Sequence, residues 1–339
     1  MMAVTIKDVA KLANVNPSTV SRVIADNPQI SEKTKKIVRA AMEQLGYHPN
    51  YSARSLVNKS TNAIGIIMPS SAEKAFQNPF FAEVLRGISN MAHKKQYSLY
   101  MSTGETEKEI YDTVVKMVQG RLVEGIILLY SRVNDQISAY LRNRDFPFVV
   151  IGRPNNDKEG IVHIDNDNFG AAKEVTKYLI DNGHQKIGFI GGSLDFVVTI
   201  DRLNGYKKAM EEANIDINND YIVHTEFHKE GGKEAIIGLM SLDTQPSALV
   251  VTDDLISFGV LSTLLEMGIK VPKDISVFSF NNIMMSEYSN PSLSSVDINI
   301  FQLGYRAVKS LVNLILNKEE VSRIIIPHKL IIRESSKKI

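Results

Sequence analysis

The sequence contains no cysteine, which excludes disulfide bonds and thiolate metal sites. It also has no apolar run approaching the roughly 18 residues that a membrane-spanning helix needs. Its first residues, MMAVTIKDVAKLA, have no apolar core of signal-peptide length before their charges. These absences predict a cytoplasmic protein. The composition, 44% hydrophobic and 23% charged over 339 residues, is typical of a soluble protein of two or three domains.

The usual catalytic and nucleotide-binding signatures are missing as well. No G-x-S-x-G, GxxxxGKS, GxxxxGKT or H-E-x-x-H occurs, and the glycines of GFIGG do not form a dinucleotide fingerprint. His224 and His228 are four residues apart, which suits a metal only on a helix, whereas YIVHTEF has the character of a strand. We therefore expect no enzyme, no metal site and no cofactor. A secreted sugar-binding protein is another class to consider, and the missing export signal disfavours it.

The charge is unevenly distributed along the chain. Residues 1–60 hold six Lys and three Arg against four acidic residues, a balance of +5. The other 279 residues hold 30 basic and 34 acidic residues, a balance of −4. A basic end on a mildly acidic body indicates that the first 60 residues meet a polyanion, although a solvated charged face would look the same.

Cap residues predict three short helices in this basic end. Thr5 can cap the first helix with Asp8 three residues later, and Asn16 followed by Pro17 can start the second. Ser31 can cap the third. Because only two residues separate the first helix from the second cap, the first two helices resemble a helix-turn-helix. We expect these residues to form the core: Val9, Ala10, Leu12, Ala13, Val20, Val23, Ile24, Ile37, Val38, Ala41, Met42 and Leu45.

The second helix then has an outward face that suits DNA. Pro17, Ser18, Ser21 and Arg22 point away from the expected core. An arginine in the major groove offers a bidentate contact to guanine, worth roughly 1–3 kcal/mol of discrimination. Four hydroxyl groups can donate to phosphates: those of Thr5, Thr19, Ser21 and Ser31. Phosphate contacts position a domain on DNA without reading its sequence. The alternative is an ordinary three-helix bundle with a solvated arginine.

From residue 61 onward, apolar runs alternate with amphipathic stretches. The runs are 63–68, 97–101, 125–130, 148–152, 186–192, 248–252 and 275–280, and helices are expected between them, as at 80–96 and 169–183. Short apolar strands separated by helices predict parallel sheets covered on both faces, and this length suits two doubly wound lobes. After the helix at 301–316, the tail RIIIPHKLIIRES supplies closing strands.

Polar and aromatic residues follow several of these strands, where the ligands of open parallel sheets bind. Carboxylate, amide and guanidinium groups can bind hydroxyls, and aromatic rings can cover the apolar face of a sugar. The candidates are Phe81, Phe196, Arg202, Phe227, Asp253 and Asn281. Taken singly, each has a simpler explanation: a Phe after a strand is more often core, and Asp253-Asp254 more often a helix cap and its neighbour.

The segment from Val4 to Leu56, with TVSRV and GYHPNYSARSL, closely resembles the DNA-binding segment of the lac-repressor/galactose-repressor family, without a gap. The resemblance implies a sequence-specific repressor of operator DNA, in which positions 17, 18 and 22 choose the operator. Pro17 departs from the usual pattern because it has no N–H and no polar side chain. The resemblance also implies a hinge helix that packs against its partner's copy over DNA, with Leu56 as a minor-groove wedge. Its other DNA-binding positions are Asn50, Tyr51, Ala53 and Arg54.

The same resemblance organises the whole chain. It implies an all-α helix-turn-helix DNA-binding domain at 1–48, a hinge helix at 49–61, and an α/β body at 62–339 like a type I periplasmic sugar-binding protein. Lobe 1 is expected at about 62–160 and 293–322, and lobe 2 at about 161–292 and 323–339. It implies that Arg202, Asp253 and Asn281, and more loosely Phe227, contact an effector sugar. Asn281 departs from the family pattern, in which an acid is common at that position.

The combination of NPFF, VEGIILLY, DNDNFGAA and SFNN is most like maltose-operon repressors of Gram-positive bacteria. The expected effector is maltose or a related sugar, and the expected assembly is a homodimer on a pseudo-palindromic operator. In the alternative, a global carbon-catabolite regulator, a phosphorylated carrier protein replaces the free sugar as signal.

Overall fold

A computed structural model of the protein describes residues 4–47, 60–69, 72–102, 104–155, 160–318 and 321–337. The contacts divide the chain into two compact units, residues 1–61 and 62–339.

The first unit contains α1 (Ile6–Leu12), α2 (Pro17–Ile24) and α3 (Glu32–Leu45). As predicted, Thr5 occupies the cap position of α1 and pairs with Asp8: its Oγ1 and its backbone N both donate to Asp8 Oδ2, at 2.7 and 2.9 Å. Ser31 Oγ accepts from Thr34 N at 3.3 Å at the start of α3. Asn16 occupies the cap position of α2 but its side chain makes no cap hydrogen bond, so α2 begins on Pro17 without that support.

The core of this unit is small, and two residues expected in it are not there. Val9, Val20 and Val38 are fully buried. Leu12 and Ile37, expected inside, are 45% and 46% exposed. Three helices of 7, 8 and 14 residues enclose too little volume to cover every apolar side chain on their inner faces.

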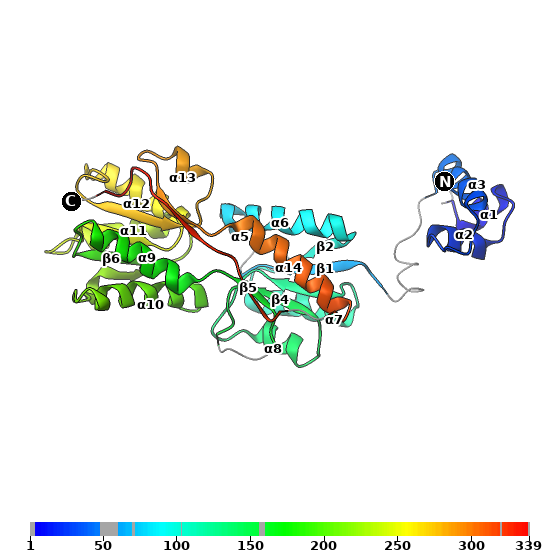
Figure 1. The fold of residues 1–339 in the computed structure, drawn as a ribbon, viewed down its shortest axis with the longest axis horizontal. Helices are drawn as coiled ribbons and strands as arrows, with labels where there is room; N and C mark the ends of the chain where they lie inside the picture. Colours follow the sequence, from blue (N-terminus) through cyan, green and yellow to red (C-terminus); the bar gives the residue numbers. More distant parts are fainter. Residues whose placement is uncertain are drawn as a thin grey trace. The chain divides into compact units, whose positions relative to one another are not determined.

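The second unit is built on two six-stranded sheets, which define lobe 1 and lobe 2 (Figure 1). In lobe 1 the strand order is β11-β5-β4-β3-β1-β2, all parallel. Its strands are β1 (Ala63–Ile67), β2 (Ser98–Met101), β3 (Gly125–Leu128), β4 (Phe148–Ile151), β5 (His163–Asp165) and β11 (Arg323–Ile325). In lobe 2 the order is β12-β10-β9-β8-β6-β7, with only β12 antiparallel. Its strands are β6 (Ile187–Gly191), β7 (Ile222–His224), β8 (Ala248–Val251), β9 (Ser276–Phe280), β10 (Ser294–Asp297) and β12 (Lys329–Ile331).

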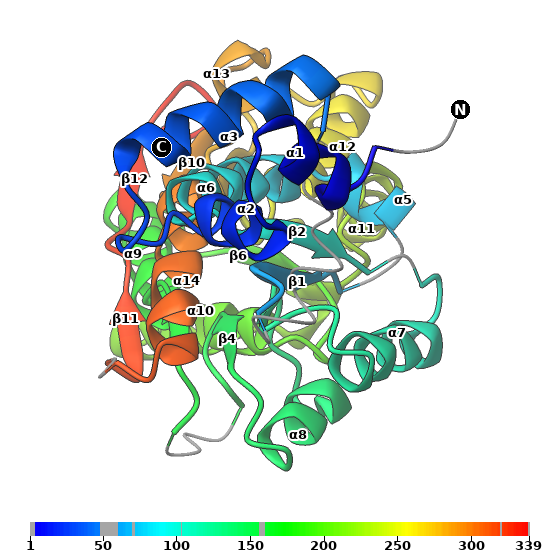
Figure 2. The ribbon, with the colours of Figure 1, turned by 90° about the vertical axis from the view of Figure 1, so that its right-hand side faces the viewer.

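Helices cover both faces of each sheet, which is why the central strands are apolar throughout. In lobe 1, α6 (Pro79–Lys95) and α14 (Ile300–Ile315) pack together on one face, while α7 (Glu107–Gln119) and α8 (Gln136–Arg142) lie on the other (Figure 2). In lobe 2, α9 (Asn168–Asp181) and α10 (Val197–Glu212) cover one face, and α11 (Lys229–Met240) and α12 (Asp254–Glu266) the other. The remaining short helices are α5 (Ala72–Gln77), α13 (Met285–Tyr288) and a 3-10 turn at Asn219–Tyr221.

The side chains of the strands alternate between these two layers. In lobe 2, Phe189 and Phe278 belong to the cluster under α9 and α10, whereas Ile190 and Val277 belong to the cluster under α11 and α12. This alternation follows from the two-residue period of a strand. It fixes the register of each sheet against both helical layers.

The chain crosses between the lobes three times, and the crossings differ from those expected. β5 and β11 add to the sheet of lobe 1, and β10 to that of lobe 2, so the crossings lie between β5 and α9, between β10 and α14, and between β11 and β12. The expected boundaries at 160, 293 and 322 are therefore each a few residues too early. β5 and β10 are only three and four residues long and are largely polar, so no apolar run marks them. Among the described residues, no helix has the length and apolar character to cross a membrane.

Candidate functional site

α2 presents the residues predicted to meet DNA. Pro17, Ser18, Ser21 and Arg22 are exposed, while Thr19 is half-buried beside the core formed by Val20 and Val23. Thr5 is exposed, but its hydroxyl donates to Asp8 and so already has one partner. The predicted hinge residues Asn50, Tyr51, Ala53, Arg54 and Leu56 lie outside the described residues.

The second unit contains a cavity of about 640 Å³ between its two lobes. All six side chains predicted to bind an effector line this cavity: Phe81, Phe196, Arg202, Phe227, Asp253 and Asn281. Phe81 comes from the start of α6 in lobe 1, and the other five come from lobe 2: from α10 and the residue before it, from the segments just after β8 and β9, and from the loop before α11. The volume lies within the range of roughly 300–1,000 Å³ that small-molecule sites have.

Arg202 is the most constrained group in the cavity. It projects from α10, is 4% exposed, and lies over the ring of Phe280 with its Cζ 4.3 Å from the ring centroid. Its Nη1 donates to Thr252 O at 2.6 Å and its Nε to Asn168 Oδ1 at 3.0 Å. Burial lowers the pKa of the guanidinium to about 10, so Arg202 remains a cation at neutral pH.

Asp253 both caps a helix and faces the cavity. Its Oδ1 accepts from Leu255 N at 2.7 Å at the start of α12. Its Oδ2 accepts from Asn281 Nδ2 at 2.8 Å and, across the lobes, from Asn78 Nδ2 at 3.2 Å. Burial, reinforced by the charge of Asp254, raises the pKa of Asp253 to about 6. Asp254 itself supports the fold, because its carboxylate accepts from Ser286 and Ser295 at 2.7 Å each.

The aromatic part of the cavity joins the two lobes. Arg132 and Phe196 form an isolated antiparallel bridge, with Val133 N donating to Asp195 O at 2.9 Å and Val197 N to Ser131 O at 3.1 Å. The Arg132 guanidinium lies over the Phe196 ring, with its Cζ 4.9 Å from the centroid, and forms an ion pair with Glu107. The ring of Phe227 lies 5.8 Å from that of Phe196 and occupies the space above Gly192, where any side chain would collide with it.

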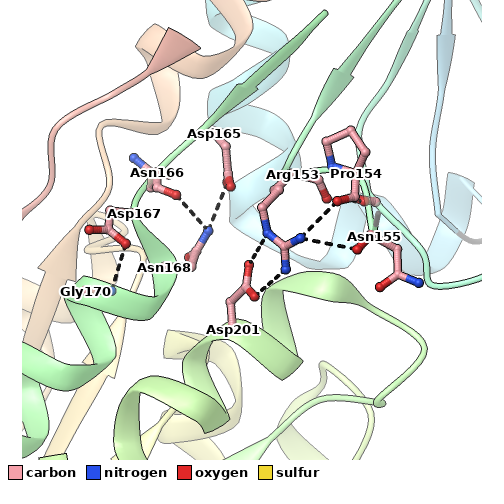
Figure 3. A network of polar contacts seen from close by, with 10 residues as sticks. Arg153, Pro154, Asn155, Asp165, Asn166, Asp167, Asn168, Gly170 and Asp201 are labelled. Atoms are coloured by element: carbon pink, nitrogen blue, oxygen red, sulfur yellow. Dashed lines mark hydrogen bonds and ion pairs between the residues drawn. The ribbon is translucent and has the colours of Figure 1, made fainter. Parts of the chain in front are cut away.

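A network of polar contacts surrounds the first crossing between the lobes (Figure 3). Arg153 in lobe 1 and Asp201 on α10 in lobe 2 form a two-pronged ion pair, with N···O distances of 2.6 and 3.1 Å. Asp165 at the end of β5 accepts from Asn168 Nδ2 at 2.9 Å, and Asn168 in turn accepts from Arg202. Burial raises the pKa of Asp165 to about 7. The sequence did not reveal Asp165 or Asn168 as site residues, because the strand before them is too short to recognise.

Asn166 connects all three crossings. Its Nδ2 donates to Ile298 O at 2.9 Å in the second crossing and to Ile326 O at 2.8 Å in the third. The backbone N of Ile326 donates back to Asp165 O at 2.7 Å. Asn166 is 4% exposed, so these bonds form away from water.

No group of His, Asp or Glu with the arrangement of a metal site occurs within the described parts of the chain. His224 lies in β7 and His228 caps α11 through Nδ1, which accepts from Gly231 N at 2.9 Å. The two histidines therefore do not share a helix.

Comparison with known proteins decides the family. Residues 5–50 match the family model described as "Bacterial regulatory proteins, lacI family", and residues 176–336 match the one described as "Periplasmic binding protein-like domain". The HTH-type transcriptional regulator MalR of Streptococcus pneumoniae is 39% identical over 338 residues, which cover 97% of this chain and 99% of MalR. The chain belongs to the LacI family of bacterial regulatory proteins.

Solved structures of transcriptional regulators have the same fold. One is a LacI transcriptional regulator from Bacillus cereus subsp. cytotoxis NVH 391-98, which is 54% identical with a TM-score of 0.80 over 82% of this chain and 99% of that one. Another is the complex of the transcriptional regulator CelR with cellobiose, which is 28% identical with a TM-score of 0.77 over 98% of this chain and all of that one. LacI-family proteins are transcriptional regulators, so this chain is not an enzyme.

Proposed function

We propose that this LacI-family protein is a cytoplasmic repressor of a sugar-utilisation operon, and that maltose or a related sugar controls its affinity for operator DNA. The observation that carries the proposal is the cavity, in which a buried arginine, an aspartate and an asparagine lie close to phenylalanine rings. Fixed donors and acceptors suit sugar hydroxyls, and rings suit the apolar face of a pyranose. The 39% identity to a regulator named MalR supports maltose as the sugar.

The proposed mechanism couples the cavity to the first unit. The protein acts as a homodimer, in which two copies of α2 read the two halves of a pseudo-palindrome, with Arg22 contacting a guanine. A sugar touches lobe 1 through Phe81 and lobe 2 through Arg202, so its affinity depends on the arrangement of the lobes. Residues 49–61 transmit that arrangement to the DNA-binding units. Sugar binding weakens operator binding, and by linkage the operator weakens sugar binding by the same factor.

The test is a titration of operator DNA with the full-length protein at fixed salt, with and without maltose. We expect maltose to raise the dissociation constant for the operator by about 5–150-fold, the range of typical allosteric coupling. Arg202→Ala is expected to abolish this response, because it removes the donor that Asn168 and Thr252 hold in place. Arg306→Ala, which removes an exposed arginine of α14 outside the cavity, is the control and retains it.

Two results would contradict the proposal. An operator affinity that maltose leaves unchanged while another sugar alters it would remove maltose as the effector. A normal maltose response in Arg202→Ala would remove Arg202 from the binding site.

A further inference from the structure

We propose that the cavity selects an unphosphorylated sugar and rejects the phosphate ester of the same sugar. This inference rests on the proposed function, which places a sugar in the cavity, and it names the chemical class of that sugar. The distinction decides which form of the sugar the protein senses.

The wall of the cavity carries an excess of negative charge. Seven carboxyl groups and three guanidinium groups line the cavity, so the formal charges of these ten groups leave an excess of four negative charges. The exposed carboxylates at its rim are Glu107, Asp195, Glu226 and Glu230. Burial raises the pKa of Asp165 and Asp253, yet two negative charges remain in excess if both of these groups are protonated. A phosphate group would therefore enter a region of like charge.

The three arginines that line the cavity already make bonds within the protein. Arg132 pairs with Glu107, and its Nη2 donates to Pro69 O at 2.8 Å. Arg153 donates to Asp201 through Nε and Nη2, and its Nη1 donates to Pro154 O at 3.1 Å. Arg202 donates to Asn168 and Thr252. Each of these guanidinium groups therefore uses some of its five N–H donors within the protein, and two of the three already face a carboxylate, so they offer a phosphate less than three unpaired arginines would.

Proteins commonly bind phosphate at helix N-termini. Three of the helices that begin at the cavity wall have a side-chain cap: Asn78 Oδ1 accepts from Phe80 N at 3.0 Å in α6, Asp253 caps α12, and His228 caps α11. α10 also begins at the wall, with Val197, whose N donates to Ser131 O at 3.1 Å in lobe 1. These amide groups are therefore committed within the protein.

A neutral sugar meets none of these obstacles. Carboxylate oxygens accept hydrogen bonds from sugar hydroxyls, and the excess of acceptors on the wall matches a ligand that is rich in donors. The same wall that repels a phosphate ester therefore binds its parent sugar.

The test compares maltose with maltose 6′-phosphate by isothermal titration calorimetry on the full-length protein. We expect the ester to bind roughly 100-fold more weakly at low salt, because its charge faces several carboxylates. The difference between the two dissociation constants is expected to shrink as the salt concentration rises, since salt screens the exposed rim charges. The double variant Glu226→Gln/Glu230→Gln should narrow the ratio of the two dissociation constants about tenfold. The control is Glu234→Gln/Glu287→Gln, which removes two exposed carboxylates outside the cavity and should leave the ratio unchanged.

The outcomes separate this inference from the proposed function. Equal or tighter binding of the phosphate ester overturns the inference alone and leaves a sugar-responsive repressor. Binding of neither ligand overturns the proposed effector together with the inference. A ratio that the rim variant leaves unchanged overturns the role assigned to the rim charges.

Discussion

Arg22 and Arg202 place the same side chain in opposite environments. Arg22 is exposed on α2, where its five N–H donors are available to a base pair. Arg202 is buried between β8, α9 and the Phe280 ring, where two of its nitrogens are held by protein acceptors. The exposed arginine is suited to recognising an external partner, and the buried one to presenting a fixed edge to a ligand inside the cavity.

At the residue scale, Arg22→Ala tests the reading of DNA sequence. The variant should lose preference at one base pair of each half-site, at a cost of about 1–3 kcal/mol per contact. Binding to a library of operators, measured at one salt concentration, reports this preference. Arg39→Ala is the charge-matched control, because Arg39 lies on α3 and pairs with Asp26 at 2.9 Å. An unchanged base preference in Arg22→Ala, or an equal loss in Arg39→Ala, would contradict the assignment.

At the scale of elements, the three crossings behave as one structure because a single amide joins them. Removing the Asn166 amide would leave the carbonyl oxygens of Ile298 and Ile326 buried without this donor. A buried acceptor that loses its partner costs roughly 1–3 kcal/mol. The three segments would then separate more readily, although the sheets on either side keep their own hydrogen bonds.

Asn166→Asp tests this connection with almost no change in size. A carboxylate at this position would face two carbonyl oxygens, so the crossings should open more often. We expect faster hydrogen exchange at the amide of Ile326, which donates to Asp165 O, with little change in the central strands β1 and β8. Asn182→Asp is the control, because its amide donates at 2.7 Å to Tyr178 O within one helix. Uniformly faster exchange across both sheets would indicate general destabilisation instead.

The elements that the sequence predicted are those with a strong pattern. Runs such as ALVVT and ISVFSF are apolar because helices cover both faces of the parallel strands, and they correspond to β8 and β9. β5 and β10 have three and four residues and read HID and SSVD, so the crossings next to them were placed too early. The residues of the candidate site were likewise predicted only where the sequence pattern is strong. Arg202 and Asp253 were found from motif and strand position, whereas Asp165 and Asn168 depend on a strand that has no apolar signature.

At the scale of the whole molecule, the buried carboxylate of Asp165 links stability to pH. Its pKa of about 7 in the folded protein lies above the ordinary value of 3.8. Between these two values the folded state binds more protons than the unfolded state, so this group makes the free energy of unfolding fall as pH rises. His184 acts in the opposite sense, because burial lowers its pKa.

Asp165→Asn isolates the contribution of this one carboxylate. The amide can still accept from Asn168 but carries no charge to desolvate. The free energy of unfolding of the variant should therefore exceed that of the parent by about 2–4 kcal/mol at pH 8 and by much less at pH 5. Urea unfolding of the full chain, followed by circular dichroism at both pH values, measures the difference. Asp243→Asn removes an exposed carboxylate of the same unit and serves as the control. Parallel pH profiles for Asp165→Asn and the parent would contradict the assignment.

The three crossings also determine when the protein can fold during synthesis. Lobe 1 starts at β1, but α14, which supplies Ala307, Val308 and Leu311 to its core, follows almost all of lobe 2 in the chain. Lobe 2 in turn waits for β12, which follows α14 and β11 in the chain and pairs with β10. In the first unit, by contrast, the three helices within residues 4–47 are complete by Leu45. We therefore expect the nascent chain to display a finished DNA-binding unit while the body that would regulate it is still without its closing segments.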